Sequence, residues 1–257
     1  MHCDVTGGQA WYVVARSKIR PMVLSNREDS GRSHGRRSSE LLPDATRRGR
    51  SGRHGNVAAV VPDLDAWQPW HPRVLGERLA GLPVPWCVAA GWALDLFRGR
   101  QTRDHGDVEI AVPRARFAEI AQRFPEVDFH VPVAGTLVPA SADTLAAGHQ
   151  TWALDRAAGC WRFDVFREPH DGDVWICRRD APIRRPYADL IRRDASGLPF
   201  LAPEVALLFK AKAARDEDCA DFAGTLPLLD ADQRQWLADA LALVHPDHSW
   251  RDAVAPG

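Results

Sequence analysis

From Pro72 onward, hydrophobic and polar positions follow regular periods. Four apolar positions at helical spacing predict a helix, namely Val74, Leu75, Leu79 and Leu82. The apolar run at residues 86–89 predicts a short buried strand, and residues 92–97 predict a second helix. An amphipathic helix that covers a sheet is predicted by the i, i+3, i+4, i+7 positions Phe117, Ile120, Ala121 and Phe124.

Strand patterns continue through the middle of the chain, and helix patterns close it. We expect strands at residues 127–131, 151–154, 161–166 and 173–177. A helix should begin after Pro203, and Asp230 with Gln233 forms a capping-box pattern before a closing amphipathic helix. The chain is therefore predicted to be α+β, with a mixed sheet flanked by helices in a core at residues 57–200 and a C-terminal helical segment at 201–257 that packs on it.

Residues 1–56 have a different character from the rest of the chain. They contain eleven Arg or Lys against five Asp or Glu and are rich in Ser and Gly, whereas the remainder carries a net charge of −7. We expect this basic extension to be disordered. An arm for nucleic acid or targeting and a plain extension remain open, and we favour the plain extension.

Two carboxylates stand close together in the segment RDHGDVEIAV. Because side chains alternate across a strand, Asp107 and Glu109 should share one face, while Val108 and Ile110 point into the core. Paired carboxylates can share hard divalent cations, with magnesium the first expectation. A solvated acidic strand end is the alternative, so the context of the pair decides between them.

The preceding segment has the order strand, tight turn and helix. Backbone N–H groups at the start of a helix attract anions, and Gly91 would let a polyphosphate approach the main chain. Arg98, Arg100 and Arg103 follow the helix and could also meet phosphate oxygens. The segment therefore favours metal-assisted transfer from a nucleotide.

The stretch AGWALDLFRGRQTRDHGDVEIAV resembles the nucleotidyltransferases of the DNA polymerase beta superfamily, which have a Gly-rich turn, a helix and an acidic strand in this order. Together with CWRFDVFREPHDGDVWICRRD and LAPEVALLFKAK, it is similar to the aminoglycoside 2''-adenylyltransferase-like family from about Asp63 to Trp250. The chain departs from that family at Ala90, which replaces the first glycine of the turn. It also has Glu217 and Cys219 where relatives commonly have lysine and glutamate.

The resemblance implies a polymerase-beta-like core and a third carboxylate on a neighbouring strand, for which Asp164 is the candidate. Asp107, Glu109 and Asp164 would then be the catalytic residues and the ligands of two Mg²⁺ ions, with Asp164 also able to act as general base. ATP would be the co-substrate. The expected nucleotide-binding residues are Gly91, Trp92, Arg100, Arg103 and Lys210.

The activity implied by the resemblance is transfer of AMP from ATP to a hydroxyl of an aminoglycoside or similar small molecule, as in antibiotic resistance. Adenylyl transfer to a protein and a non-catalytic nucleotide-binding module remain alternatives. The −7 balance of the body argues against a nucleic-acid acceptor. By position alone, Trp152, Trp175, Glu168, Asp171 and Asp173 are guesses for contacts to the acceptor.

Composition and motifs narrow the class further. With 45% hydrophobic and 26% charged residues, the chain falls within the range of ordinary globular proteins. No apolar run is long enough to span a bilayer, so we expect a cytoplasmic protein that is not in a membrane. A Walker A string and a Gly-x-Ser-x-Gly elbow are both absent from the sequence, which leaves P-loop kinase and serine hydrolase readings without support.

Overall fold

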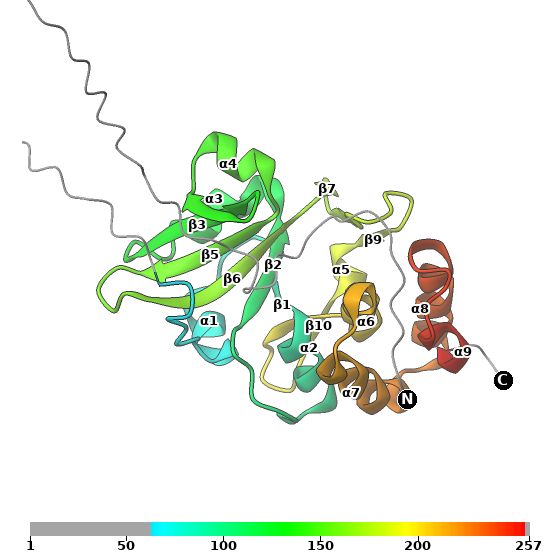
Figure 1. Cartoon of the computed structure of the whole chain (residues 1–257). Helices are drawn as coiled ribbons and strands as arrows, with labels where there is room; N and C mark the ends of the chain where they lie inside the picture. Colours follow the sequence, from blue (N-terminus) through cyan, green and yellow to red (C-terminus); the bar gives the residue numbers. More distant parts are fainter. Residues whose placement is uncertain (1–62, 255–257) are drawn as a thin grey trace, which may run out of the picture.

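The computed structural model describes residues 63–254. The predicted basic extension at residues 1–56 lies outside this part of the chain, and the division into two parts at residue 200 stays a prediction. A large sheet forms the centre of the molecule, and the C-terminal helices gather at the end away from β3 (Figure 1).

The central sheet has eight strands in the order β10-β11-β1-β2-β6-β5-β3-β4. The β2 strand is antiparallel to β1 but parallel to β6, so the sheet is mixed as predicted. A second sheet of three strands has the order β7-β8-β9. The strands of the large sheet are β1 (Cys87–Val88), β2 (Glu109–Pro113), β3 (Val127–Val133), β4 (Thr136–Pro139), β5 (Gln150–Asp155), β6 (Cys160–Glu168), β10 (Ile191–Arg193) and β11 (Pro199–Leu201); those of the small sheet are β7 (His170–Asp171), β8 (Val174–Ile176) and β9 (Arg184–Pro186).

Helices flank the sheet, and several are joined by short 3-10 turns. The helices are α1 (Pro72–Arg78), α2 (Ala90–Arg98), α3 (Phe117–Ala121), α4 (Ala142–Ala147), α5 (Tyr187–Leu190), α6 (Pro203–Lys210), α7 (Asp216–Thr225), α8 (Ala231–Val244) and α9 (Trp250–Val254). The 3-10 turns are η2 (Arg114–Arg116), η3 (Ala211–Ala213) and η4 (Leu226–Leu228). The α6 helix packs on both α2 and α8, so the C-terminal helices are joined to the turn that follows β1.

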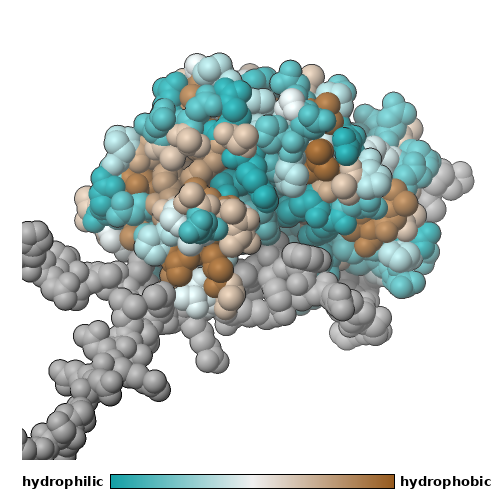
Figure 2. All heavy atoms as spheres, turned by 90° about the horizontal axis from the view of Figure 1, so that it is seen from above, coloured by the Kyte–Doolittle hydropathy of each residue, from teal (hydrophilic) through white to brown (hydrophobic). Residues whose placement is uncertain are grey.

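The core follows the predicted alternation along the central strands. Val108 and Ile110 are fully buried, as are Phe163 and Val165 of β6. A separate cluster of Trp152, Trp161 and Leu137 is packed against Trp67 and Leu64. Hydrophobic residues on the face in Figure 2 occur in small groups among hydrophilic ones.

The predicted α+β class, a mixed sheet flanked by helices with a C-terminal helical part, is confirmed. The capping box is also confirmed, because the Asp230 side chain accepts from Gln233 N at 2.8 Å and Gln233 Oε1 accepts from Asp230 N at 3.0 Å. Several boundaries differ by a few residues, and the one that bears on the site is that β2 begins at Glu109, so Asp107 precedes it. Pairing nevertheless reaches past the strand, because Asp164 N donates to Val108 O at 2.9 Å.

Candidate active site

A cavity of about 950 Å³ lies between the central sheet and the C-terminal helices. Its walls come from β1, β2, β5 and β6 on one side and from α6, η3 and α7 on the other. Asp107, Glu109 and Asp164 all line it, together with Gly91. The cavity therefore contains the predicted carboxylates and the predicted phosphate-binding turn.

The strand register sets the relation between the carboxylates. Glu109 and Asp164 are direct partners across the parallel pair β2 and β6. Neighbouring strands are about 4.8 Å apart, and partner residues project from the same face. Asp107, two residues before Glu109, is on that face as well, whereas Val108 between them is fully buried on the opposite side.

Two of the three carboxyl groups, those of Glu109 and Asp164, have a raised pKa. Burial raises the pKa of Glu109 well above its ordinary value, and the charges of Asp107 and Asp164 add to the rise. Burial is also the main reason why the pKa of Asp164 is raised to about 7, with the charge of Asp107 as a further cause. The cluster therefore holds negative charge that the protein alone does not fully offset.

The side chain of Asp164 is held by the neighbouring strand β5. Gln150 Nε2 donates to Asp164 Oδ2, and Thr151 N donates to Asp164 Oδ1 at 3.3 Å. Within residues 63–254, no three His, Cys, Asp or Glu side chains are arranged to hold a metal ion. Asp107 and Glu109 still offer the oxygen donors that Mg²⁺ prefers, and their repulsion would be relieved by a cation. Asp164, whose carboxylate oxygens are held by Gln150 and Thr151, is not arranged with them as a third ligand.

The turn before α2 is tightly packed. Ala90 has φ of 49°, the left-handed region in which an alanine is strained, and Ala89 caps the helix without a side-chain hydrogen bond. A Cβ on Gly91 would lie 2.4 Å from Arg103 Nη2 and 2.8 Å from His105 Cε1. A side chain at position 91 would therefore displace Arg103 and the ring of His105.

The predicted nucleotide-binding residues divide into two groups. Gly91, Arg103 and Lys210 line the cavity. Arg100 is exposed and is not among the lining residues, and Trp92 stacks on His105 with ring centroids 4.4 Å apart. The structure thus brings the first three to the carboxylates, while Arg100 and Trp92 face elsewhere.

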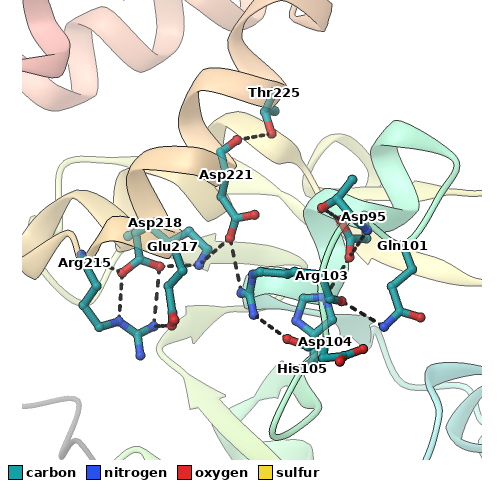
Figure 3. Close-up of polar contacts among 12 residues, drawn as sticks. Asp95, Gln101, Arg103, Asp104, His105, Arg215, Glu217, Asp218, Asp221 and Thr225 are labelled. Carbon is teal, nitrogen blue, oxygen red and sulfur yellow. Dashed lines mark hydrogen bonds and ion pairs between the residues drawn. The ribbon is translucent and has the colours of Figure 1, made fainter. Parts of the chain in front are cut away.

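Arg103 and Lys210 are joined by acids of α7, as Figure 3 shows for the contacts of Asp221 and Asp218. Arg103 Nη2 lies 3.3 Å from Asp221 Oδ2, and Lys210 Nζ lies 3.0 Å from the same oxygen. Lys210 Nζ is also 2.5 Å from Asp218 Oδ1. These contacts hold both cations beside the cavity, and the aspartates neutralise part of their positive charge.

Comparisons with known proteins bear on this geometry. The model of the family described as aminoglycoside-2''-adenylyltransferase matches residues 73–138, which run from α1 to β4 and include the turn, α2 and the acidic strand. The predicted resemblance to the aminoglycoside-2''-adenylyltransferase family is confirmed. The family is one of adenylyltransferases, and no curated protein matches the chain.

Solved structures with a similar arrangement include two antibiotic adenylyltransferases. The lincosamide adenylyltransferase LnuA bound to lincomycin is 13% identical, with 61% of this chain and 95% of that chain covered and a TM-score of 0.44. ANT(2'')-Ia in complex with adenylyl-2''-tobramycin is 12% identical, with 66% and 93% covered and a TM-score of 0.44. An antigenic nucleotidyltransferase-like protein from Paracoccidioides brasiliensis is 18% identical, with 70% and 88% covered and a TM-score of 0.39.

Within the segment that matches the aminoglycoside-2''-adenylyltransferase family, the sequence analysis missed Asp95 and His105. His105 Nε2 lies 2.6 Å from Asp95 Oδ2, and Thr102 N donates to the same oxygen at 3.2 Å. Burial alone would raise the pKa of Asp95, but the bonds from His105 and Thr102 lower it. Asp95 therefore ties the loop at 99–106 to α2, and the only sequence signal was an acidic residue inside an apolar helix.

Gln150, Asp218 and Asp221 were also missed, because their role depends on contacts from distant segments. Gln150 meets Asp164 from the next strand, and the two aspartates of α7 contact Lys210, with Asp218 also lining the cavity. Within the described part of the chain, no helix is long and apolar enough to cross a membrane.

Proposed function

We propose that the protein is a magnesium-dependent nucleotidyltransferase that moves AMP from ATP to a hydroxyl group of a small molecule. The observation that carries the proposal is the pair Asp107 and Glu109, which faces a cavity across from Asp164 and next to the start of α2. The family match over this segment supports adenylyl transfer in preference to other metal-assisted chemistry.

Asp107 and Glu109 would hold Mg²⁺, with Asp164 joining them after rotation of its side chain. When bound, the ion would neutralise charge on the phosphates of ATP and favour departure of pyrophosphate. Gly91 lines the cavity at the start of α2, where a phosphate would meet the backbone N–H groups of the helix. Arg103 and Lys210 border the same part of the cavity and would bind phosphate oxygens.

Asp164 is also the proposed general base. Its carboxyl group is buried, and burial raises its pKa, which makes the carboxylate a better acceptor for a hydroxyl proton. The deprotonated oxygen would bond to the α-phosphorus as the bond to the pyrophosphate oxygen breaks. The products are an AMP ester of the acceptor and pyrophosphate.

The first acceptors to test are aminoglycosides, the compounds named by the matched family. Trp152, Trp175 and Glu168 line the cavity and are available for an acceptor. Asp171 and Asp173 are exposed and are not among the lining residues, so we do not include them.

The decisive measurement is pyrophosphate release from ATP and Mg²⁺ with a panel of hydroxyl compounds that includes aminoglycosides. We expect Asp107→Asn to lower the rate at least a hundredfold, because it removes a charge from the pair that binds the ion. Asp189→Asn is the matched control, since Asp189 is exposed on α5 and does not line the cavity. Equal rates for Asp107→Asn and the unmodified protein would refute the proposal.

The alternatives give different results in the same assay. A non-catalytic module would bind ATP without releasing pyrophosphate in the presence of any acceptor. A protein acceptor would be revealed by transfer of labelled AMP to polypeptide in place of a small molecule.

A further inference from the structure

The cavity has a second cationic region that the proposed chemistry does not use. Arg178, Arg179 and Lys212 line it, and Arg178 forms an ion pair with Glu168. Glu168 is four residues beyond Asp164 on β6, and with about 3.3 Å per residue the two positions are separated by roughly 13 Å. We call Arg178, Arg179 and Lys212 the far cluster, because Arg178 pairs with Glu168 at the end of β6 away from Asp164.

The positive charge of the far cluster is only partly balanced. Glu168 is the acid with which Arg178 pairs, and Arg179 donates to the main-chain oxygens of Leu208 at 2.9 Å and Phe209 at 2.8 Å. Lys212 makes no hydrogen bond or ion pair with any residue in 63–254. Two of the three cations thus lack a carboxylate partner in the described part of the chain.

Aromatic rings hold the two arginines in place. The guanidinium carbon of Arg178 lies 4.2 Å from the ring centroid of Phe209 and 5.5 Å from that of Phe166. That of Arg179 lies 4.7 Å from Phe209. Such stacking fixes the planar groups while leaving N–H donors at their edges free to bind a ligand.

The surrounding side chains respond to this charge. Burial and, after it, the nearby arginines, with Arg178 foremost, lower the pKa of His149 to about 3. The pKa of His245 is lowered to about 4 by burial and then by Arg179. Both imidazoles are therefore neutral at pH 7, and they do not add to the charge of the far cluster.

A buried hydroxyl group without a partner faces the same cavity. Tyr187 is 8% exposed and lines the cavity, and its hydroxyl has no hydrogen-bond partner among the described residues. A buried polar group in this state carries an energetic cost that a bound ligand would remove. The hydroxyl can donate to an anion.

The cations near the carboxylates are a separate group with their own partners. Lys210 contacts Asp218 and Asp221, Arg103 contacts Asp221, and Arg215 contacts Asp218 at 3.0 Å. These residues border the site proposed for the phosphates of ATP. The far cluster is thus available for a different anionic group.

We infer that the acceptor of the proposed reaction carries a carboxylate or phosphate group, which binds to Arg178, Lys212 and the hydroxyl of Tyr187. That this ligand is the acceptor of a reaction rests on the proposed function, whereas the binding of an anion at this place does not. The surplus charge would repel a polycationic aminoglycoside from this end of the cavity.

Binding tests the site without any chemistry. Calorimetry with the full chain would compare glycerol 3-phosphate, glycerate and glycerol, which share hydroxyl groups but differ in charge. The titrations are made with and without saturating Mg²⁺ and α,β-methylene ATP, which occupies the proposed nucleotide site but cannot be cleaved at the α-phosphate. We expect at least one of the two anions to bind in both conditions and glycerol to bind in neither.

Variants locate the binding. Lys212→Gln should weaken the anion about tenfold, the loss expected for one charge-assisted hydrogen bond. Tyr187→Phe should weaken it by about threefold to tenfold and removes only a hydroxyl that has no partner, so the fold is kept. Arg192→Gln is the control, because Arg192 is an exposed cation on β10 outside the cavity.

Several results would overturn the inference. One is equal binding of glycerol and both anions, and another is unchanged affinity in both Lys212→Gln and Tyr187→Phe. Loss of anion binding when the nucleotide analogue is present would assign the far cluster to the terminal phosphates of ATP instead.

The pyrophosphate assay separates this inference from the proposed function. If a polycationic aminoglycoside is turned over but neither anion is, the proposed function is kept and this inference is rejected. If an anion binds but no acceptor is turned over, the anion site is kept and the proposed function is rejected.

Discussion

At the scale of single residues, the site depends on two small residues in one turn, Ala90 and Gly91. Gly91 is needed because a Cβ there would collide with Arg103 and His105. Ala90 adopts φ of 49°, and the family pattern has a glycine at this position. The departure from the family pattern at Ala90 therefore falls on a residue with left-handed backbone.

Replacement of Ala90 by glycine should therefore stabilise the protein. Relief of the left-handed strain is worth about 1–2 kcal/mol, less about 0.5–1 kcal/mol for the greater freedom of glycine in the unfolded chain. We expect a net gain of about 0.5–1 kcal/mol in the free energy of unfolding, measured by urea titration. Ala93→Gly is the matched comparison, because Ala93 is buried inside the same helix and should lose stability by about 1 kcal/mol or more. A loss in both variants would show that Ala90 is not strained.

At the scale of elements, the sequence predicted those with strong periodicity. The alternation of Val108 and Ile110 fixed the face of the acidic strand, and the capping box fixed the start of α8. The β4 strand and α7 were not predicted. The α7 helix contains four acidic residues among ten and has a weak apolar stripe, since much of its inner face is made of the buried acids Asp218 and Asp221.

The predicted site was limited in the same way. Two carboxylates next to each other in one strand can be read from a local pattern, whereas Asp164 required the family resemblance. The hold of Gln150 on Asp164 and the contacts of α7 depend on tertiary packing between segments far apart in the sequence. Local periodicity carries no information about such contacts.

Asp221 of α7, which contacts three cations, should be important for the stability of the fold. Asp221 is 2% exposed and lies within 3.3 Å of Arg98, Arg103 and Lys210. Asp221→Asn would leave these cations without a shared anion, and we expect a loss of about 3 kcal/mol in the free energy of unfolding by urea titration. Glu77→Gln on the exposed face of α1 should change it by less than about 0.5 kcal/mol. A similarly small effect for Asp221→Asn would mean that solvent replaces the pairing.

At the scale of the whole molecule, we expect the stability of the fold to depend on pH and on Mg²⁺ through the carboxylate cluster. An Asp side chain in an unfolded chain has a pKa near 3.9, whereas that of Asp164 is raised to about 7. Between these values the folded state binds more protons than the unfolded state, so this group lowers stability as pH rises and has no further effect above pH 7.

Without metal, we therefore expect unmodified protein to lose stability relative to Asp164→Asn between about pH 4 and pH 7. The relative loss should be of the order of a few kcal/mol, and urea titrations at several pH values in EDTA would measure it. Addition of Mg²⁺ at pH 7.5 should recover part of the loss in the unmodified protein and less in Asp107→Asn. A difference between the two proteins that does not vary with pH would contradict the raised pKa of Asp164.

The pairing of the central strands also limits when the site can form during synthesis. The β2 strand is in the first half of the described chain, but its parallel neighbour β6 comes about fifty residues later, and β1 pairs with β11 at Phe200. A chain emerging from the ribosome therefore carries Asp107 and Glu109 for some time before Asp164 can face them. Until β6 and β11 have been translated, the half-made sheet has open edges on both sides, and this interval is when the nascent protein is most exposed to mispairing and to chaperones.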